Sequence, residues 1–492
     1  MVKTEKTEKK VRKITVSLLD DPVIPILSTL SEEIETPLYI VGGYVRDFLL
    51  GRTVKDIDVM ASGDGISVAK AFADKIGAGN VIVYEKFGTA MVKLSNRDIE
   101  FVGARKEKYH ESSRKPSVQP ATVDEDLSRR DFTINAIAIA MHPSEYGVLL
   151  DPFKGKADLK KKIIRTPLDP DETFDDDPLR MLRAIRFAAR LDFTIHRDTL
   201  QGIKKNKERI SIVSQERITD ELLKIIQGDK PSAGFFLLKE TGLLKIIFPE
   251  IDALAGVDQR YEHHHKDVFY HTLQVLDNIS EHTDDVYLRI AALVHDIAKP
   301  KTKAFHPQQG WTFHGHEELG ARMIKHLFKR FKLPLDRVPY VEKLVRLHLR
   351  PMALVDEGVT DSAVRRLLFE TGEEIDDLMK LCRADITSKN PRKVKQYLNN
   401  YNRLVNRMGE IEKKDRLRNW QPPIRGNEIM ERFNIPPGKL VGVLKKAVED
   451  AILDGKIPNE YEAALEYLYK VKDDIIREYN KHVSSESENK CE

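Results

Sequence analysis

Short alternating segments in the first part of the chain predict a sheet. Leu38–Val41 is a continuous apolar strand, and Asp56–Ala61 alternates polar and apolar residues as a half-buried strand does. Further strands are predicted at Val81–Glu85, Thr89–Leu94 and Asp98–Gly103, with a helix at Ile66–Ile76 and a basic loop at Arg105–Lys115. These elements predict a head that mixes strands and helices.

Helical periodicity dominates the rest of the chain. From Val213 onward, helical patterns separated by short loops predict α-helical domains. The expected fold class is therefore α+β: a head with a mixed or antiparallel sheet and helices, followed by an all-α neck, body and tail. The predicted segments are a flexible basic arm (1–20), the head (21–165), a helical neck (166–228), a helical body (229–400), a helical tail (401–480) and a disordered C-terminus (481–492).

Composition excludes several classes of protein. The chain has 81 Lys+Arg and 78 Asp+Glu, a net charge of +3, so any nucleic-acid surface must be local. Cys382 and Cys491 exclude a disulfide framework and fit a reducing compartment. The N-terminus lacks the apolar core of a signal peptide, and no apolar run approaches the roughly 20 residues that span a bilayer. We expect a soluble, cytoplasmic protein with no membrane contact and no obligate protein partner.

The run GGYVRDFLLGRTVKDIDVM, residues 42–60, carries the most specific chemistry. Gly42 and Gly43 follow the first strand and allow backbone N–H groups to approach a phosphate, with Arg46 on the helix after them. Asp56 and Asp58 alternate on the next strand, so their carboxylates point the same way, roughly 7 Å apart. Paired carboxylates suit a pair of hard divalent cations. A lone Gly-Gly or a lone D-x-D is usually structural, but the combination predicts a metal-dependent site for a nucleoside triphosphate.

A third carboxylate is predicted beside this pair. Asp98 and Glu100 share one face of the strand Asp98–Gly103, and one of them can lie next to the D-x-D strand. We favour Glu100. An ordinary exposed acidic face is the alternative.

The pattern G-G-x-x-R-D followed by D-x-D resembles the signature of the nucleotidyltransferase superfamily that includes tRNA CCA-adding enzymes and bacterial poly(A) polymerases. The resemblance implies two Mg²⁺ ions in the head, held by Asp56 and Asp58. With the third carboxylate favoured above, the predicted catalytic residues are Asp56, Asp58 and Glu100. The resemblance also implies that Gly42, Gly43 and Arg46 hold the triphosphate. It covers most of residues 35 to 470.

A second cluster lies in EDLSRRDFTINA, residues 125–136, which is predicted to open a helix. Asp131 and Asn135 are four residues apart and would share a face that can bind ribose hydroxyls, while Arg129 and Arg130 would face phosphates. An amphipathic helix packed through its apolar residues is the structural alternative. The segment resembles the second signature of the same superfamily.

The third cluster is DDDPLRMLRAIRFAAR, residues 175–190. Its arginines recur every three or four residues and form a stripe on a predicted helix; they are Arg180, Arg183, Arg186 and Arg190. A stripe of this kind is more often a solvated face, but most of it has no acidic partner four residues away. We therefore expect contact with nucleotide or RNA phosphates, with Arg186 and Arg190 on the RNA.

Asp177 and Arg180 are three residues apart and can converge on one base. A carboxylate accepts from the exocyclic amine of cytosine or adenine, and a guanidinium donates to the adjacent ring nitrogen. Uracil and guanine present the opposite polarity there, so a buried site would reject them. The segment DDPLR resembles the EDxxR motif of class II CCA-adding enzymes, with Asp176 in place of Glu. The family's ERxxxE motif matches Glu216-Arg217 and Glu221, which in the family steadies the nucleotide-recognition helix.

Histidines and aspartates recur in the predicted body, between about 260 and 390. His295 and Asp296 are adjacent within an apolar helix, and His271, His314, His316, His348 and Asp385 lie on neighbouring segments. Such groups can converge on a divalent metal. The arrangement resembles the HD-domain superfamily of metal-dependent phosphohydrolases, which implies His271, His295, Asp296 and Asp385 as ligands of Mn, Ni or Mg.

These features together predict a template-independent CCA tRNA nucleotidyltransferase whose partners are tRNA, CTP and ATP. The nearest alternative is a poly(A) polymerase, which shares the head motifs. A third profile adds only A to tRNA that ends in CC. From a different class, the HD centre alone would be the working phosphohydrolase, with an inert head; the intact glycines and carboxylates of the head argue against it.

Overall fold

The computed structural model describes residues 21–488 except 55, 86–87, 96, 111–112, 262–263, 309, 356–359, 389 and 416–421. The predicted basic arm, Cys491 and the last residues therefore lie outside the described parts. The chain divides into two compact units, Met1–Pro249 and Glu250–Glu492. Within the described parts, no helix combines the length and apolar composition needed to cross a membrane.

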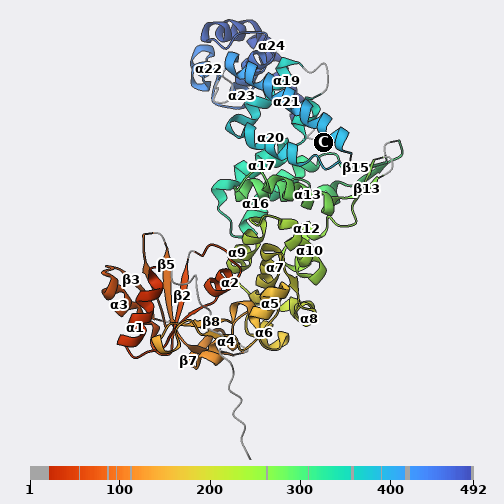
Figure 1. The fold of residues 1–492 in the computed structure, drawn as a ribbon. Helices are drawn as coiled ribbons and strands as arrows, with labels where there is room; N and C mark the ends of the chain where they lie inside the picture. The colour runs from red at the N-terminus through yellow and green to blue at the C-terminus, as the bar shows by residue number, and fades with distance from the viewer. Residues whose placement is uncertain are drawn as a thin grey trace, which may run out of the picture. The chain divides into compact units, whose positions relative to one another are not determined.

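The first unit begins with a mixed sheet and continues in helices (Figure 1). Its elements are α1 (Val23–Glu33), β1 (Leu38–Val41), α2 (Gly43–Leu49), β2 (Ile57–Ala61), α3 (Gly65–Ile76), β3 (Val81–Tyr84), β4 (Thr89–Lys93), β5 (Asp98–Gly103), β6 (Arg105–His110), β7 (Ser113–Pro120), α4 (Val123–Ser128), η3 (Thr133–Asn135), β8 (Ala138–Ala140), β9 (Leu149–Leu150), α5 (Gly155–Lys161), β10 (Ile163–Ile164), α6 (Pro170–Asp176), α7 (Leu179–Leu191), β11 (Thr194–Ile195), α8 (Arg197–Asn206), α9 (Gln215–Ile226), α10 (Pro231–Thr241) and α11 (Leu243–Ile247). The short α12 (Pro249–Asp252) contains the boundary between the units.

The sheet places the predicted metal strand at its centre. Its order is β3-β4-β5-β2-β1-β8-β9, with β2 and β5 parallel and the other pairs antiparallel. Residues of β1 and β2 are almost all buried, and α3 packs against β4 and β5. Asp64 caps α3 by accepting from the N–H groups of Ile66 and Ser67, and Gly77 ends it in the left-handed region. The predicted strands and this helix are confirmed to within one or two residues, and Asp56 directly precedes β2.

Two predicted segments of the head were wrong. The basic loop at 105–115 is part of the antiparallel hairpin β6–β7, which the sequence hides because it contains few apolar residues. The predicted helix over 125–136 ends at Ser128, and a single 3₁₀ turn, η3, follows. The side chain of Asp131 accepts from the backbone N–H of Phe132, and such local bonds compete with helix formation.

The second unit is largely helical. Its elements are β12 (Asp258–Tyr261), β13 (His264–Asp267), α13 (Val268–Ser280), α14 (Val286–Val294), α15 (Lys299–Thr302), β14 (Ala304–His306), β15 (Gly310–Thr312), α16 (His316–Arg330), α17 (Val338–Leu347), α18 (Arg350–Ala353), α19 (Asp361–Thr371), α20 (Ile375–Ala384), α21 (Pro391–Asp415), α22 (Gly426–Phe433), α23 (Lys439–Leu453) and α24 (Tyr461–Glu488). The α+β class is thus confirmed. The expectation of purely α-helical later domains is corrected by the pair β10–β11 and the hairpins β12–β13 and β14–β15.

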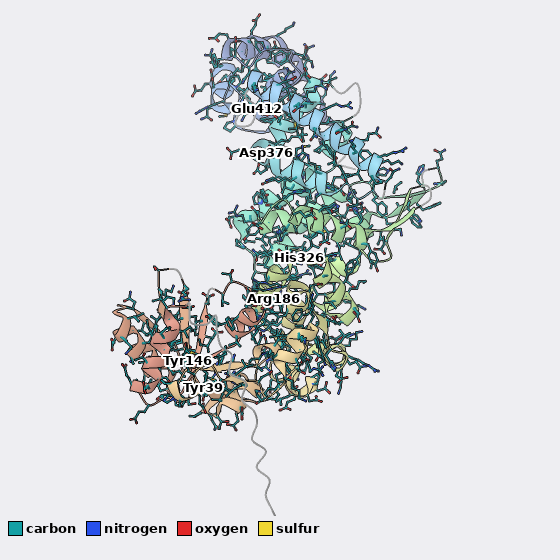
Figure 2. All side chains as sticks on the ribbon, in the orientation of Figure 1. Tyr39, Tyr146, Arg186, His326, Asp376 and Glu412 are labelled. Carbon is teal, nitrogen blue, oxygen red and sulfur yellow. The ribbon has the colours of Figure 1, made fainter. Side chains whose placement is uncertain are left out.

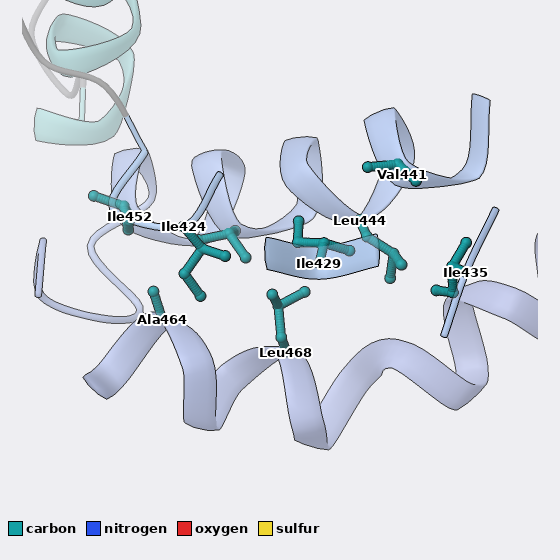
Figure 3. Packing of buried hydrophobic residues seen from close by; sticks show 9 residues of the cluster. Ile424, Ile429, Ile435, Val441, Leu444, Ile452, Ala464 and Leu468 are labelled. Atoms are coloured by element: carbon teal, nitrogen blue, oxygen red, sulfur yellow. The ribbon is translucent and has the colours of Figure 1, made fainter. Parts of the chain in front are cut away.

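The last helices of the second unit form a core of their own. Figure 3 shows Ile429 of α22, Leu444 of α23 and Leu468 of α24 meeting in a shared apolar cluster. Helix α24 extends to Glu488, into the segment from residue 481 that the sequence predicts to be disordered.

Candidate active site

The turn after β1 brings two oppositely charged groups to one glycine. Gly42 has φ 72°, a conformation that favours glycine, and it caps the N-terminus of α2. A Cβ atom at this position would lie 3.1 Å from Asp58 Oδ2 and 3.1 Å from Arg130 Nη1. The glycine therefore allows a carboxylate and a guanidinium to approach the turn together.

The negative charges of the predicted carboxylates Asp56 and Glu100 both act on Asp58 at the centre of the sheet. Asp58 of β2 is the register partner of Glu100 on the parallel strand β5. Burial raises the pKa of Asp58 to about 6; Arg130 opposes this rise, while the negative charges of Glu100 and Asp56 add to it. A divalent cation would relieve this excess of negative charge, so the residues fit the metal that the head family implies. Asp58 lines the adjoining cleft, whereas Asp56 and Glu100 are not among the residues that line it.

A cleft of about 600 Å³ joins this centre to helix α7. Nine arginines and four aspartates line it, so its walls are strongly cationic and suit a triphosphate. The predicted residues that line it are Gly42, Gly43, Arg46, Asp58, Arg130, Asp131, Asn135, Asp177, Arg180, Arg183, Arg186 and Arg190. The structure thus brings the glycine turn, one carboxylate of the D-x-D pair and the predicted base-reading residues to a single cavity.

A chain of side-chain contacts runs along one wall of the cleft. Arg46 forms a bidentate pair with Asp47 (2.8 and 2.6 Å) and donates to Asn135 Oδ1 (2.8 Å). The amide of Asn135 donates to Asp131 Oδ1 (2.8 Å), and Asp131 Oδ2 accepts from Arg183 Nε and Nη2 (2.9 and 2.7 Å). Burial would raise the pKa of Asp131, but Arg183 and Asn135 outweigh it and lower that pKa. These polar groups are therefore held in fixed positions.

The predicted base-reading residues, Asp177 and Arg180, have partners within the first unit. Asp177 Oδ1 accepts from the N–H of Leu179 (3.2 Å), and its other oxygen accepts from Arg217 (2.8 Å), which is half exposed. Arg180 is buried and donates to the carbonyl oxygens of Arg129 (2.6 Å) and Thr173 (3.3 Å). Backbone contacts fix the Arg180 guanidinium, whereas Asp177 is held by a surface pair that a ligand can displace.

The arginine stripe of α7 has long-range acidic partners. Arg183 pairs with Asp131, and Arg186 Nε donates to Glu221 Oε2 of α9 at 2.6 Å. Figure 2 labels Arg186, whose side chain is only 8% exposed. Arg190 is exposed at the cleft. The proposed RNA contact through Arg186 and Arg190 stays a prediction, and exposure favours Arg190.

Two residues of this region were missed. Asp126, fully buried, accepts from Arg129 (2.6 Å) and Arg130 (2.9 Å), which places both guanidinium groups at the cleft. The guanidinium groups of three arginines lie near the ring of Phe187. Their distances to the ring centroid are 5.0 Å for Arg46, 5.5 Å for Arg183 and 4.1 Å for Arg186. The signal for Asp126 was its spacing of three and four residues before the two arginines. The sequence held no comparable signal for Phe187.

The second unit brings the predicted HD residues together. His271 on α13 and His295 after α14 lie 3.6 and 3.2 Å from Asp296 Oδ2, measured from their Nε2 atoms. Asp385, directly after α20, lies 3.0 Å from His271 Nε2. His316 and His348 join the same buried cluster, whereas His314 is exposed. Histidine nitrogens and carboxylate oxygens in this arrangement fit a divalent transition metal.

The charges of this cluster are strongly coupled. Burial would raise the pKa of Asp296, but His295 and Lys299 lower it well below its ordinary value. Burial would lower the pKa of His295, but Asp296 and Asp385 raise it to about 9. Burial and the neighbouring His295 together lower the pKa of His348 to about 4. The carboxylates therefore create a site that attracts positive charge.

Comparison with known proteins matches both units. Residues 38–165 match the Poly A polymerase head domain, residues 192–254 the probable RNA and SrmB-binding site of polymerase A, and residues 268–389 the HD domain. A solved tRNA nucleotidyltransferase complexed with a primer tRNA and an incoming ATP analog has 26% identity and a TM-score of 0.55, covering 77% of this chain and 99% of that one. A CCA-adding enzyme solved with CTP shares the fold at a TM-score of 0.60 and 24% identity, over 92% of this chain and 96% of that one.

Curated relatives agree with these matches. An A-adding tRNA nucleotidyltransferase of Deinococcus radiodurans is 30% identical over 435 residues, which are 86% of this chain and 93% of the relative. A multifunctional CCA protein of Shewanella frigidimarina is 37% identical over 308 residues, 60% of this chain and 70% of the relative. With the head motifs, the charged cleft and the HD cluster in place, the chain belongs to the CCA-adding family of tRNA nucleotidyltransferases and carries an HD domain.

Proposed function

We propose that this enzyme completes the 3′ end of tRNA by adding C, C and A from CTP and ATP. The single observation that carries the proposal is the shared cleft. Asp58 of the sheet and Asp177 and Arg180 of the neck line the same cavity, so a nucleotide held there would present its phosphates to one group and its base to the other.

The residues of the cleft divide into two roles. Asp56, Asp58 and Glu100 would hold two Mg²⁺ ions, which supply activation of the primer 3′-hydroxyl and charge neutralisation at the leaving pyrophosphate. Gly42, Gly43 and Arg46 would bind the triphosphate, and Asp131 with Asn135 would bind the ribose. The existing contacts along this wall orient these groups before a substrate arrives, and catalysis of this kind depends mainly on positioning.

Base selection is assigned to Asp177 and Arg180. The carboxylate would accept from the amine of C or A once it exchanges its half-exposed partner Arg217 for the base. The guanidinium of Arg180, already fixed by two carbonyl oxygens, would donate to the ring nitrogen. A uracil or guanine would place a carbonyl against the carboxylate and an N–H against the guanidinium, and both contacts would be lost.

An incorporation assay tests this proposal. The protein is incubated with tRNA that lacks its terminal CCA, first with CTP alone and then with ATP, and the 3′ ends are sequenced. Two C residues followed by one A are expected. Addition of A only to tRNA ending in CC would instead establish the A-adding activity that the name of the Deinococcus relative states. Long A tails on unrelated RNA would establish a poly(A) polymerase.

The assay is repeated with Asp58→Ala and with the matched control Asp74→Ala, an exposed carboxylate on α3. Asp58→Ala is expected to abolish nucleotide transfer while tRNA binding stays near that of the parent protein. Asp74→Ala should leave both unchanged. Near-parental incorporation by Asp58→Ala would contradict the assignment of the head.

A second activity is favoured by the HD cluster. We propose that His271, His295, Asp296 and Asp385 bind a divalent metal and that this centre hydrolyses phosphate esters. The buried histidines and carboxylates support the metal, and the HD match supports the reaction class. Phosphatase activity that survives Asp58→Ala but disappears in Asp296→Ala would support this role. Activity unaffected by Asp296→Ala would refute it.

A further inference from the structure

Most of the nine arginines that line the cleft are already held by other groups of the protein. Seven of them donate to a carboxylate, an amide or a backbone carbonyl; they are Arg46, Arg129, Arg130, Arg180, Arg183, Arg186 and Arg217. For the other two, Arg52 and Arg190, the described residues provide neither an ion pair nor a side-chain hydrogen bond. Both are exposed, so their guanidinium groups can turn to a ligand in the cleft.

We propose that Arg52 is a catalytic residue that binds the terminal phosphates of the incoming nucleotide and stabilises pyrophosphate as it leaves. The inference rests on the proposed nucleotide transfer and adds to it a residue that the sequence motifs did not single out. Arg190 keeps its predicted role on the RNA.

The backbone of Arg52 is fixed although its side chain is free. Helix α2 is followed by Gly51, whose φ is 68°. The N–H of Arg52 donates to the carbonyl oxygen of Asp47 (2.9 Å), and the N–H of Gly51 donates to that of Phe48 (3.0 Å). These two bonds form a Schellman motif, which ends a helix with a defined geometry. The Arg52 side chain therefore starts from a fixed point and can follow a ligand without a change of the backbone.

The chain around Arg52 belongs to the part of the cleft proposed to bind phosphates. Asp47, whose carbonyl oxygen fixes Arg52, also holds the guanidinium of Arg46 through its carboxylate (2.8 and 2.6 Å). Arg46 is proposed to bind the triphosphate, and Asp56, a proposed metal ligand, follows Arg52 by four residues. Arg190 comes instead from the end of α7. Arg52 is thus the free arginine that is connected to the triphosphate residues.

A free guanidinium suits a group that must move with its ligand. During transfer the primer 3′-oxygen forms a bond to the α-phosphorus, and the bond from that phosphorus to the oxygen shared with the β-phosphate breaks. This oxygen keeps the electron pair and leaves with pyrophosphate, while the hydroxyl proton passes to water. Negative charge therefore grows on the β-phosphate, where a guanidinium can donate two hydrogen bonds. An arginine in a buried pair could follow the departing group only by leaving its carboxylate unpaired.

Two ligands that carry different phosphates test this inference in the full chain. Pyrophosphate represents the β- and γ-phosphates, and AMP represents the base, the ribose and the α-phosphate. Their dissociation constants are measured by titration calorimetry with Mg²⁺ present. Arg52→Gln is expected to weaken the binding of pyrophosphate roughly tenfold, the effect of losing a hydrogen bond between charged groups, and to leave the binding of AMP unchanged. Arg52→Lys should recover part of the loss, because it keeps the charge without the bidentate geometry.

Steady-state kinetics give a second measurement. The KM values for CTP and ATP should rise by the same factor in Arg52→Gln, since the two nucleotides share the triphosphate and differ only in the base. The KM for tRNA should stay at the parental value. A purely structural effect on the cleft would not separate the nucleotides from the tRNA in this way.

Two other arginines serve as matched controls. Arg197→Gln removes the same charge from an exposed position at the start of α8, and Arg197 is not among the residues that line the cleft. It should leave every constant unchanged. Arg190→Gln removes the other free arginine and should raise the KM for tRNA while the binding of pyrophosphate stays the same. Circular dichroism of each variant verifies that it is folded.

The possible failures are distinct. Pyrophosphate that binds Arg52→Gln as it binds the parent, or that does not bind the parent, would overturn the inference. Equal losses for pyrophosphate and AMP would overturn it as a general disturbance of the cleft, and a rise confined to the KM for tRNA would assign Arg52 to the RNA instead. Calorimetry needs no turnover. Pyrophosphate binding that depends on Arg52 in a chain that transfers no nucleotide would therefore support the phosphate contact and refute the proposed function.

Discussion

Glu221 pairs with Arg186, which lines the cleft, and its substitution is expected to destabilise this region strongly. It is 2% exposed on α9, and its Oε2 accepts from Arg186 Nε at 2.6 Å. Arg186 is itself 8% exposed, so Glu221→Gln would leave a guanidinium buried without its counter-charge. Breaking a buried ion pair by removing one partner costs about 3–5 kcal/mol. The ring of Phe187, 4.1 Å from the Arg186 guanidinium, retains part of the stabilisation, which favours the lower end of about 3 kcal/mol.

The matched control is the preceding residue. Asp220 is 63% exposed and pairs with Lys224 across one turn of the same helix at 2.6 Å. An exposed pair of this kind contributes about 0.3–0.5 kcal/mol, so Asp220→Asn should be nearly silent. Both substitutions remove one negative charge from α9. Any large difference between them therefore reports burial rather than net charge.

The assay must report the stability of the first unit. Both tryptophans, Trp311 and Trp420, belong to the second unit, so intrinsic tryptophan fluorescence does not follow the cleft. Hydrogen exchange measured by mass spectrometry on peptides from α7 and α9 does. A loss of about 3 kcal/mol corresponds to exchange roughly 100-fold faster through the opening reaction. Protection in Glu221→Gln equal to that in Asp220→Asn would refute the claim that the pair holds the helix.

Two further substitutions test the head. Gly65→Ala should destabilise it by about 2 kcal/mol, because the new Cβ would lie 2.6 Å from backbone atoms of Val102 and Gly103. The control, Gly79→Ala, places its Cβ in open space and should change the free energy of unfolding by less than about 0.5 kcal/mol. Urea unfolding followed by circular dichroism compares the two variants. Asp126→Asn should destabilise at neutral pH, and its cost should shrink in acid. Burial would raise the pKa of Asp126, but its arginine partners lower it below the unfolded value of about 3.9, so its contribution is complete above that value and disappears as pH falls through the folded pKa. A cost that stays constant from pH 7 to pH 3 would contradict this reasoning.

Local patterns predicted the elements whose stability is local. The apolar run of β1, the alternation of β5 and the helical spacing of α3 lie within single segments, and their bounds matched. The glycine turn and the D-x-D pair were readable for the same reason, since they occupy one strand–helix–strand unit. The hairpin β6–β7 was missed because backbone pairing stabilises it without an apolar pattern in the sequence.

Long-range pairing explains most of what the sequence hid. The sequence predicts that the stripe of α7 contacts RNA, because most of its arginines have no acidic residue four positions away. Its partners are Asp131, 52 residues from Arg183, and Glu221, 35 residues from Arg186. A search along one helix cannot find them. The same limit concealed the contacts of Asp296 with His316 and His348, which come from helices that are distant in sequence.

The pairing of α7 also links the two halves of the proposed reaction. Arg183 binds Asp131, which binds Asn135, which accepts from Arg46 beside the glycine turn. Each carboxylate or amide in this chain holds the group on either side, so the residues proposed to bind the triphosphate and the base belong to one continuous hydrogen-bonded wall. Movement of α7 would then displace Arg46 as well as the residues proposed to read the base. A substitution at Glu221 should therefore alter the binding of the triphosphate together with the choice of base, and not base choice alone.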